Sequence, residues 1–312
     1  MMLRSFVMTV IFAVYATLPS SANASLVCEV DIVSLDFGMI SVRDGLSLRT
    51  SGPVTIDCNG GTPGTTIQAC VTIGSGSGGS VPGQSPRYMT GDGTAPLAYQ
   101  LTAQNSFSSG GSIWETVGYA IPLDATGSAT IATTLHAEVT AVAAQATVGS
   151  YSSRFDGGSD VNVSYGEIEC NQSGATSAFS VSASLAASCD VSVSNMDFGV
   201  IDNAIVAPVD QTATIEVSCT NASGYTVGIG PGLQPAGAGP TGRRMANGTS
   251  LLAYGLYHDE SRTSDWGLTP ATVAGGTGTG GNQSQTVFGR IFGNQSASMG
   301  SYSDSVVVIV TY

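Results

Sequence analysis

An internal repeat that includes the cysteines constrains this chain more than any other feature. Cys28 and Cys58 are 30 residues apart, and so are Cys189 and Cys219. A shift of 161 residues superposes these pairs, and it also places Asp36 to Gly38 on a second Asp-Phe-Gly at Asp197 to Gly199. Arg-x-Met, Leu-Ala-Tyr, tryptophan and Gly-Ser-Tyr-Ser landmarks then follow in the same order in both halves. Landmarks that recur in one order indicate two copies of one domain.

The repeat also predicts the cysteine pairing. Six cysteines allow many pairings, and spacing alone does not choose among them. The cysteines that are equivalent in the two copies give Cys28–Cys58 and Cys189–Cys219. Cys70 and Cys170 have no counterpart in the second copy, so they are left to pair with each other.

Residues 1–24 have the pattern of a secretory signal peptide. Arg4 supplies the positive start, an apolar stretch runs from Ser5 to Leu18, and Ala22 to Ala24 has the small-x-small form that signal peptidase cleaves. A membrane anchor is the alternative, but the apolar stretch is shorter than the ~20 residues that a span needs. Export to an oxidising compartment agrees with reading all six cysteines as disulfides.

The local pattern predicts strands throughout both copies. Apolar and polar residues alternate in Val54 to Asp57, Val161 to Tyr165 and Ala213 to Ser218, with Gly-, Ser- and Asn-rich turns between such runs. The expected fold is therefore all-β, with two tandem β-sandwich domains at 25–165 and 189–312. Residues 166–188 are expected to form a linker between them.

Composition excludes several classes of function. The chain has nine basic and 22 acidic residues, for a net charge of −13, and it lacks the basic cluster that nucleic-acid or anionic-membrane binding needs. Two histidines leave little scope for metal or acid–base chemistry. The GxGxxG matches, such as Gly74 to Gly79, do not connect a strand to a helix and predict no cofactor site. A secreted β-sandwich hydrolase with clustered carboxylates remains an alternative.

Residues that recur in both copies are interpreted as structural. Trp114 and Trp266 occupy equivalent places, which favours core packing over ligand stacking. Arg87 and Arg244 also recur, and we expect each to orient a loop.

The segment between the copies contains the clearest amphipathic strand in the chain. Phe179, Val181, Ala183 and Leu185 fall on one face of an extended chain, and serines fall on the other. Copy one has no equivalent strand before its first cysteine if residues 1–24 are removed.

Copy two contains an ordered set of motifs, which are Cys189, Asp197 to Gly199, Cys219, Arg244-Met245, Leu252 to Leu256, Trp266-Gly267 and Gly300 to Tyr312. With these motifs it resembles the spore coat protein U domain, the pilin domain of archaic (Csu-type) chaperone–usher pili. Copy one fits less well, because Glu115 replaces Gly267 and Ser153 replaces Asp304. The resemblance implies immunoglobulin-like sandwiches that lack one strand, which a neighbouring subunit donates. It also implies a periplasmic chaperone, an outer-membrane usher and an adjacent pilin subunit as partners.

The resemblance leaves two interpretations of the strand that contains Phe179 to Leu185. In the first interpretation, this strand completes copy one within the same chain, so that copy two has an empty groove to be filled by another polypeptide. Alternatively, it is the first strand of copy two. The sequence does not decide between them.

The expected function is that of a tip adhesin or minor subunit of such a pilus, which mediates surface attachment and biofilm formation without catalysis. The expected location is the cell surface, reached through the periplasm. Copy one would contact an abiotic or host surface through loops 74–85, 105–113 and 141–148. The candidate contact residues in these loops are Val81, Pro82, Phe107, Ile113, Val142 and Val148. Capping of the sandwich core is the alternative role for these side chains, and a coat or pilus-shaft protein is the alternative function.

Overall fold

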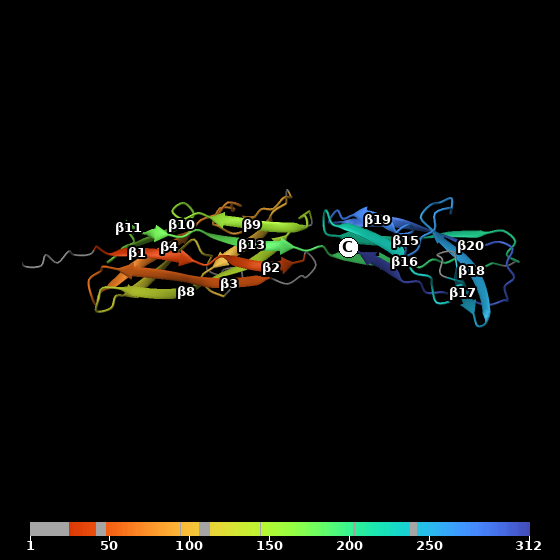
Figure 1. The fold of residues 1–312 in the computed structure, drawn as a ribbon, viewed down its shortest axis with the longest axis horizontal. Helices are drawn as coiled ribbons and strands as arrows, with labels where there is room; N and C mark the ends of the chain where they lie inside the picture. Colours follow the sequence, from red (N-terminus) through yellow and green to blue (C-terminus); the bar gives the residue numbers. More distant parts are fainter. Residues whose placement is uncertain are drawn as a thin grey trace, which may run out of the picture.

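The computed structural model describes residues 25–41, 48–93, 95–105, 113–143, 145–201, 204–237 and 242–312. These residues form strands, turns and loops, so the expected all-β fold is confirmed. Figure 1 shows two elongated bodies that lie end to end, residues 25–185 (the first body) and residues 189–312 (the second body). Among the described residues, no helix has the length and hydropathy of a membrane span. The signal-peptide prediction for residues 1–24 lies outside the described residues.

The first body contains three sheets. Its strands are β1 (Val27–Ile32), β2 (Leu35–Ile40), β3 (Arg49–Asn59), β4 (Thr66–Ile73), β5 (Arg87–Met89), β6 (Leu97–Thr102), β7 (Thr116–Pro122), β8 (Ala129–Val142), β9 (Gly149–Phe155), β10 (Val161–Gly166), β11 (Gln172–Ser173), β12 (Ala175–Thr176) and β13 (Phe179–Leu185). The sheet orders are β12-β1-β3-β8-β6-β5, β11-β10-β4-β7 and β2-β13-β9. Apolar side chains at alternate positions of these strands face one shared core.

The second body contains two sheets. Its strands are β14 (Cys189–Val193), β15 (Val209–Cys219), β16 (Gly224–Ile229), β17 (Arg243–Asn247), β18 (Ser250–Tyr257), β19 (Ala274–Thr277), β20 (Asn282–Ile291) and β21 (Val308–Thr311). The sheet orders are β14-β15-β20-β18-β17 and β19-β16-β21. Nothing in the second body corresponds to the β2-β13-β9 sheet of the first, within the residues described.

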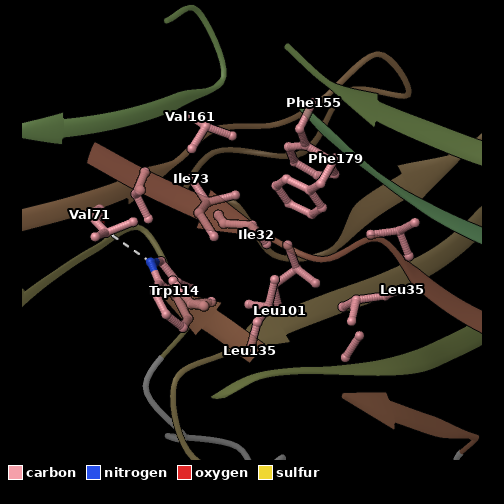
Figure 2. Close-up of a cluster of buried hydrophobic side chains, with 14 of the residues drawn as sticks. Ile32, Leu35, Val71, Ile73, Leu101, Trp114, Leu135, Phe155, Val161 and Phe179 are labelled. Carbon is pink, nitrogen blue, oxygen red and sulfur yellow. Dashed lines mark hydrogen bonds between the residues drawn. The ribbon is translucent and has the colours of Figure 1, made fainter. Parts of the chain in front are cut away.

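The two tryptophans are buried in equivalent places, one in each core. The Trp114 indole Nε1 donates to the Val71 carbonyl at 3.1 Å, which Figure 2 shows, and Trp266 Nε1 donates to the Val227 carbonyl at 2.9 Å. A buried indole N–H needs such an acceptor. The expected role of both tryptophans in core packing is therefore confirmed.

A buried arginine also recurs, but it is Arg243 rather than Arg244 that corresponds to Arg87. The guanidinium of Arg87 donates to the carbonyl oxygens of Ile73, Gly74 and Trp114. Arg243 makes the equivalent bonds to Ile229, Gly230 and Trp266. Arg244 is one residue further along the strand, so its side chain points to the opposite face and bonds to an exposed loop. Burial lowers the pKa of Arg87 to about 10.

Three disulfides connect the six cysteines. Cys28–Cys58 joins β1 to β3, and Cys189–Cys219 joins β14 to β15. Cys70–Cys170 joins β4 to the turn that precedes β11. These are the three pairs to which the repeat points.

Candidate functional site

Strand β13 lies between β2 and β9 in the first body. It runs antiparallel to β9, with Phe179 opposite Phe155, and parallel to β2. Its apolar side chains, those of Phe179, Val181, Ala183 and Leu185, are all buried in the first core. The Phe179 ring stacks on Phe155 with the centroids 4.4 Å apart, as Figure 2 shows. The strand therefore completes the first body rather than beginning the second.

The serine face of β13 is also matched to its neighbours. The Ser180 amide donates to Ser34 Oγ at 3.0 Å, and the Ser182 hydroxyl donates to Asp36 Oδ1 at 3.0 Å. Alternation thus places each kind of side chain where it has a partner. The packing of the apolar face supplies most of the stabilisation, because a hydrogen bond contributes only about 1 kcal/mol net.

The strand is the last part of a longer segment that crosses the whole first body. Upstream of β13, β11 pairs with β10 and β12 pairs with β1. Residues 172–185 therefore lie between the first strands of the body, β1 and β2, and its last strands, β9 and β10. Most of the stretch expected from sequence to be a linker, 166–188, is integrated into the first body.

The described part of the second body lacks such a segment. By the repeat, β14 corresponds to β1, residues 196–201 to β2, residues 300–306 to β9 and β21 to β10. β14 and β21 are edge strands, and neither 196–201 nor 300–306 is assigned as a strand. Among the described residues, no strand lies between these two sides. We call this set, β14, 196–201, 300–306 and β21, the open edge of the second body.

Apolar side chains that are buried in the first body are exposed at the open edge. Val30 is 2% exposed and its counterpart Val191 is 42% exposed. Ile40 is 1% exposed, against 36% for Ile201. At the end of the last strand, Tyr165 is 4% exposed and Tyr312 is 59% exposed. Edge strands with unpaired backbone groups beside exposed apolar side chains are a template for addition of a strand.

Residues 300–306 are held in position without a strand beside them. Tyr254 donates its hydroxyl to Asp304 Oδ2 at 2.6 Å, and the Leu233 amide donates to Asp304 Oδ1 at 2.8 Å. Burial, and then this contact with Asp304, raise the pKa of Tyr254. The Ser303 backbone pairs with Ala246 of β17. One side of the segment is therefore fixed, and the side that corresponds to the β13 contact is left open.

The candidate surface-contact residues of copy one do not gather at one place. Val81 and Pro82 lie in a loop closed by a bond from the Val81 amide to Pro86, and Ile113 pairs with Thr102 beside Trp114. Val142 packs against the first core. The Val148 amide donates to the Asn221 carbonyl of the second body, so this residue lies at the joint between the bodies. Phe107 lies outside the described residues.

Two stretches of the chain, residues 14–156 and residues 175–309, match the sequence model of the Spore Coat Protein U domain. The chain belongs to this family. Protein U of Myxococcus xanthus is 34% identical over 119 residues, a match that covers 36% of this chain and 66% of Protein U, which is slightly less than two thirds.

One solved structure from a pilus system shares the fold. A chain of the CsuC–CsuE chaperone–tip adhesion subunit pre-assembly complex, from archaic chaperone-usher Csu pili of Acinetobacter baumannii, matches with a TM-score of 0.51 at 15% identity. That match covers 91% of this chain and all of the other. The CupB6 tip adhesin of Pseudomonas aeruginosa matches with a TM-score of 0.35 at 12% identity, over 92% of this chain and 94% of that chain.

The family match and the structure divide the chain differently. The second match begins at residue 175 and so includes β12 and β13. The structure nevertheless places both strands in the first body. In sequence, the inserted strand is the leading part of the second repeat. In space, it completes the first.

Proposed function

We propose that this protein is a two-domain tip adhesin or minor subunit of an archaic chaperone–usher pilus, assembled by donor-strand complementation. The contrast between the two bodies carries the proposal. β13 fills the first body within the chain, and the same position of the second body is bordered by open edges. The second body then accepts a strand from a periplasmic chaperone and later from an adjacent pilin subunit at the outer-membrane usher.

The internal use of β13 supports a place at the end of the fibre. A shaft or coat subunit needs a strand that is free to reach its neighbour. Within the described residues, the strand with this pattern is already inserted in the first body, between β2 and β9. The first body would then face outward from the cell surface and attach to an abiotic or host surface, which supports biofilm formation. We infer no catalytic role.

An extended chain tests strand acceptance. A second copy of residues 166–188, with Cys170→Ser in that copy, is appended after Tyr312. Tyr312 corresponds to Tyr165, after which the first body receives this same segment, and the C-terminus lies beside the joint in Figure 1. The matched control carries Val181→Asp and Leu185→Asp in the appended copy only, which places charges at buried positions.

We expect the extended chain to be monomeric and soluble without a chaperone. We also expect the unfolding transition of its second body to shift to higher temperature than in the control. Equal transitions in the extended chain and its control would refute strand acceptance. A carboxylate-dependent hydrolase, the alternative ranked below a coat or shaft protein, would need no chaperone and would show no gain from the appended strand.

A further inference from the structure

The joint between the two bodies has two parts. One is the strand connection, because β13 ends at Leu185 and β14 begins at Cys189, so only residues 186–188 lie between the bodies. The other is a direct contact between the bodies. The Asn221 side-chain amide donates to the Gln145 carbonyl at 2.7 Å, and the Val148 amide donates to the Asn221 carbonyl at 3.2 Å. The turn after the second cysteine of one body therefore docks on loop 145–148 of the other.

The second body has its own counterpart of loop 145–148, which is residues 296–299. In the first body the Tyr151 hydroxyl donates to the Thr147 carbonyl at 2.9 Å, and in the second the Tyr302 hydroxyl donates to the Ser298 carbonyl at 3.1 Å. The next glycine has a positive φ in both, +135° at Gly149 and +142° at Gly300. The same loop geometry is thus present at the end of the open edge.

Only the first of these two loops is covered. Ala146 is buried, whereas its counterpart Ala297 is exposed. Val148 is partly buried at the joint, whereas its counterpart Met299 is 99% exposed. Methionine is a flexible apolar side chain that is frequent at protein-binding surfaces.

We propose that residues 296–299 are the docking surface for the body of the subunit that fills the open edge. This inference rests on the proposed function. The occupant is another domain of the Spore Coat Protein U family, which presents the turn after its second cysteine as Thr220 and Asn221 do at the internal joint. The residue at the position of Asn221 would donate from its polar side chain to the Ser296 carbonyl, and its backbone carbonyl would accept from the Met299 amide.

The short connection is the physical reason. A chain of three residues spans at most about 10–11 Å when it is fully extended. A strand inserted in the open edge in the register of β13 ends beside residues 296–299, as Leu185 ends beside loop 145–148. The body that follows such a strand after a connection like 186–188 is therefore held against this loop. The joint inside the chain is a template for the joint to the next subunit.

A longer extended chain tests the docking surface. A second copy of residues 166–312, with Cys170→Ser in that copy, follows Tyr312 and supplies both a strand and a third body. Ser298→Cys in the second body is combined with Asn221→Cys in the appended copy. The positive control is Thr147→Cys with Asn221→Cys in the unextended chain, because these two residues face each other in a bridge at the internal joint. The negative control pairs Ser298→Cys with Asn247→Cys of the appended copy.

We expect the Ser298 cysteine to form a disulfide with the appended Asn221 cysteine under mild oxidation, to the same extent as the positive control. The negative control should form at least tenfold less. Peptide mapping by mass spectrometry identifies the bond. A stabilised second body in the strand-only chain together with an absent cross-link would overturn the docking surface and leave strand acceptance intact. An unstabilised strand-only chain would instead refute the proposed function.

Discussion

Replacement of Phe179 by alanine measures how much the first body depends on β13. The side chain is buried and stacks on Phe155, so truncation removes the ring and leaves a cavity. Truncation of a buried phenylalanine costs about 3–5 kcal/mol. In a body of this size each kcal/mol lowers Tm by about 2–4 °C, so we expect the Tm of the first body to fall by about 10 °C.

The assay uses the fact that each body contains one tryptophan, Trp114 in the first and Trp266 in the second. In a Trp266→Phe background, fluorescence reports only the first body, and in a Trp114→Phe background it reports only the second. Phe179→Ala should lower the transition seen by Trp114. The matched control is Phe198→Ala, which removes a ring packed against the second core and should lower only the transition seen by Trp266.

The reasoning is refuted if Phe179→Ala lowers the transition of Trp266 and leaves that of Trp114 unchanged. That result would assign β13 to the second body in solution. A fall of less than about 1 kcal/mol in the first body would also contradict it, because so small a loss is far below the cost of a buried phenylalanine cavity.

Three further outcomes follow from single features of the two bodies. Alanine at both Cys70 and Cys170 removes a disulfide that closes a separation of 100 residues. In urea titrations, this change should lower the free energy of unfolding of the first body by up to about 4–5 kcal/mol and leave that of the second body unchanged. Arg87→Met should cost the first body about 3 kcal/mol or more in the same assay, since it leaves four carbonyl oxygens, those of Ile73, Gly74, Gln84 and Trp114, without this donor. The hydrogen bond from Arg290 holds the pKa of Asp210 below its usual value. The stabilisation of the second body by this carboxylate is therefore present above the unfolded pKa of about 4 and is lost as the pH falls through the lower folded pKa. Asp210→Asn should therefore destabilise the second body by less than about 1 kcal/mol at pH 7 in urea titrations, and an equal deficit at pH 2 would contradict this account.

The sequence predicts most of the fold because the information is local or repeated. Period-two alternation predicts strands, and the repeat predicts two bodies and points to the cysteine pairs. The Arg244 prediction was wrong for a physical reason. The Arg-x-Met spacing of the repeat aligns Arg87 with Arg243, and the structure agrees, because Arg243 lies on the side of β17 that faces the core and Arg244 on the opposite side.

The position of β13 could not be predicted from its own residues. An alternating Phe-x-Val-x-Ala-x-Leu pattern states that one face is buried, but not in which body. The decision depends on the partners of the strand, which are Leu35 to Ile40 and Gly149 to Phe155, far from it in sequence. Residues 296–299, the docking surface that we propose, were also not predicted from the sequence. The signal that could have found it is its counterpart, 145–148, once the joint is known.

The sequence repeat and the folded bodies are offset from each other, because β13 belongs to the second repeat in sequence and to the first body in the fold. The two bodies of the chain are therefore not equivalent. A strand within the same polypeptide acts at a high effective concentration, and Cys70–Cys170 ties it covalently to β4, so closure of the first body does not depend on any partner. Among the described residues, the open edge of the second body has no such strand, so on the proposed function its stability rises with the concentration and affinity of the polypeptide that would bind it. On the proposed function, the first body is therefore closed in every state of the chain, and the second body gains further stability when it is assembled. On the proposed function, growth of a fibre from such a chain would continue from the second body alone.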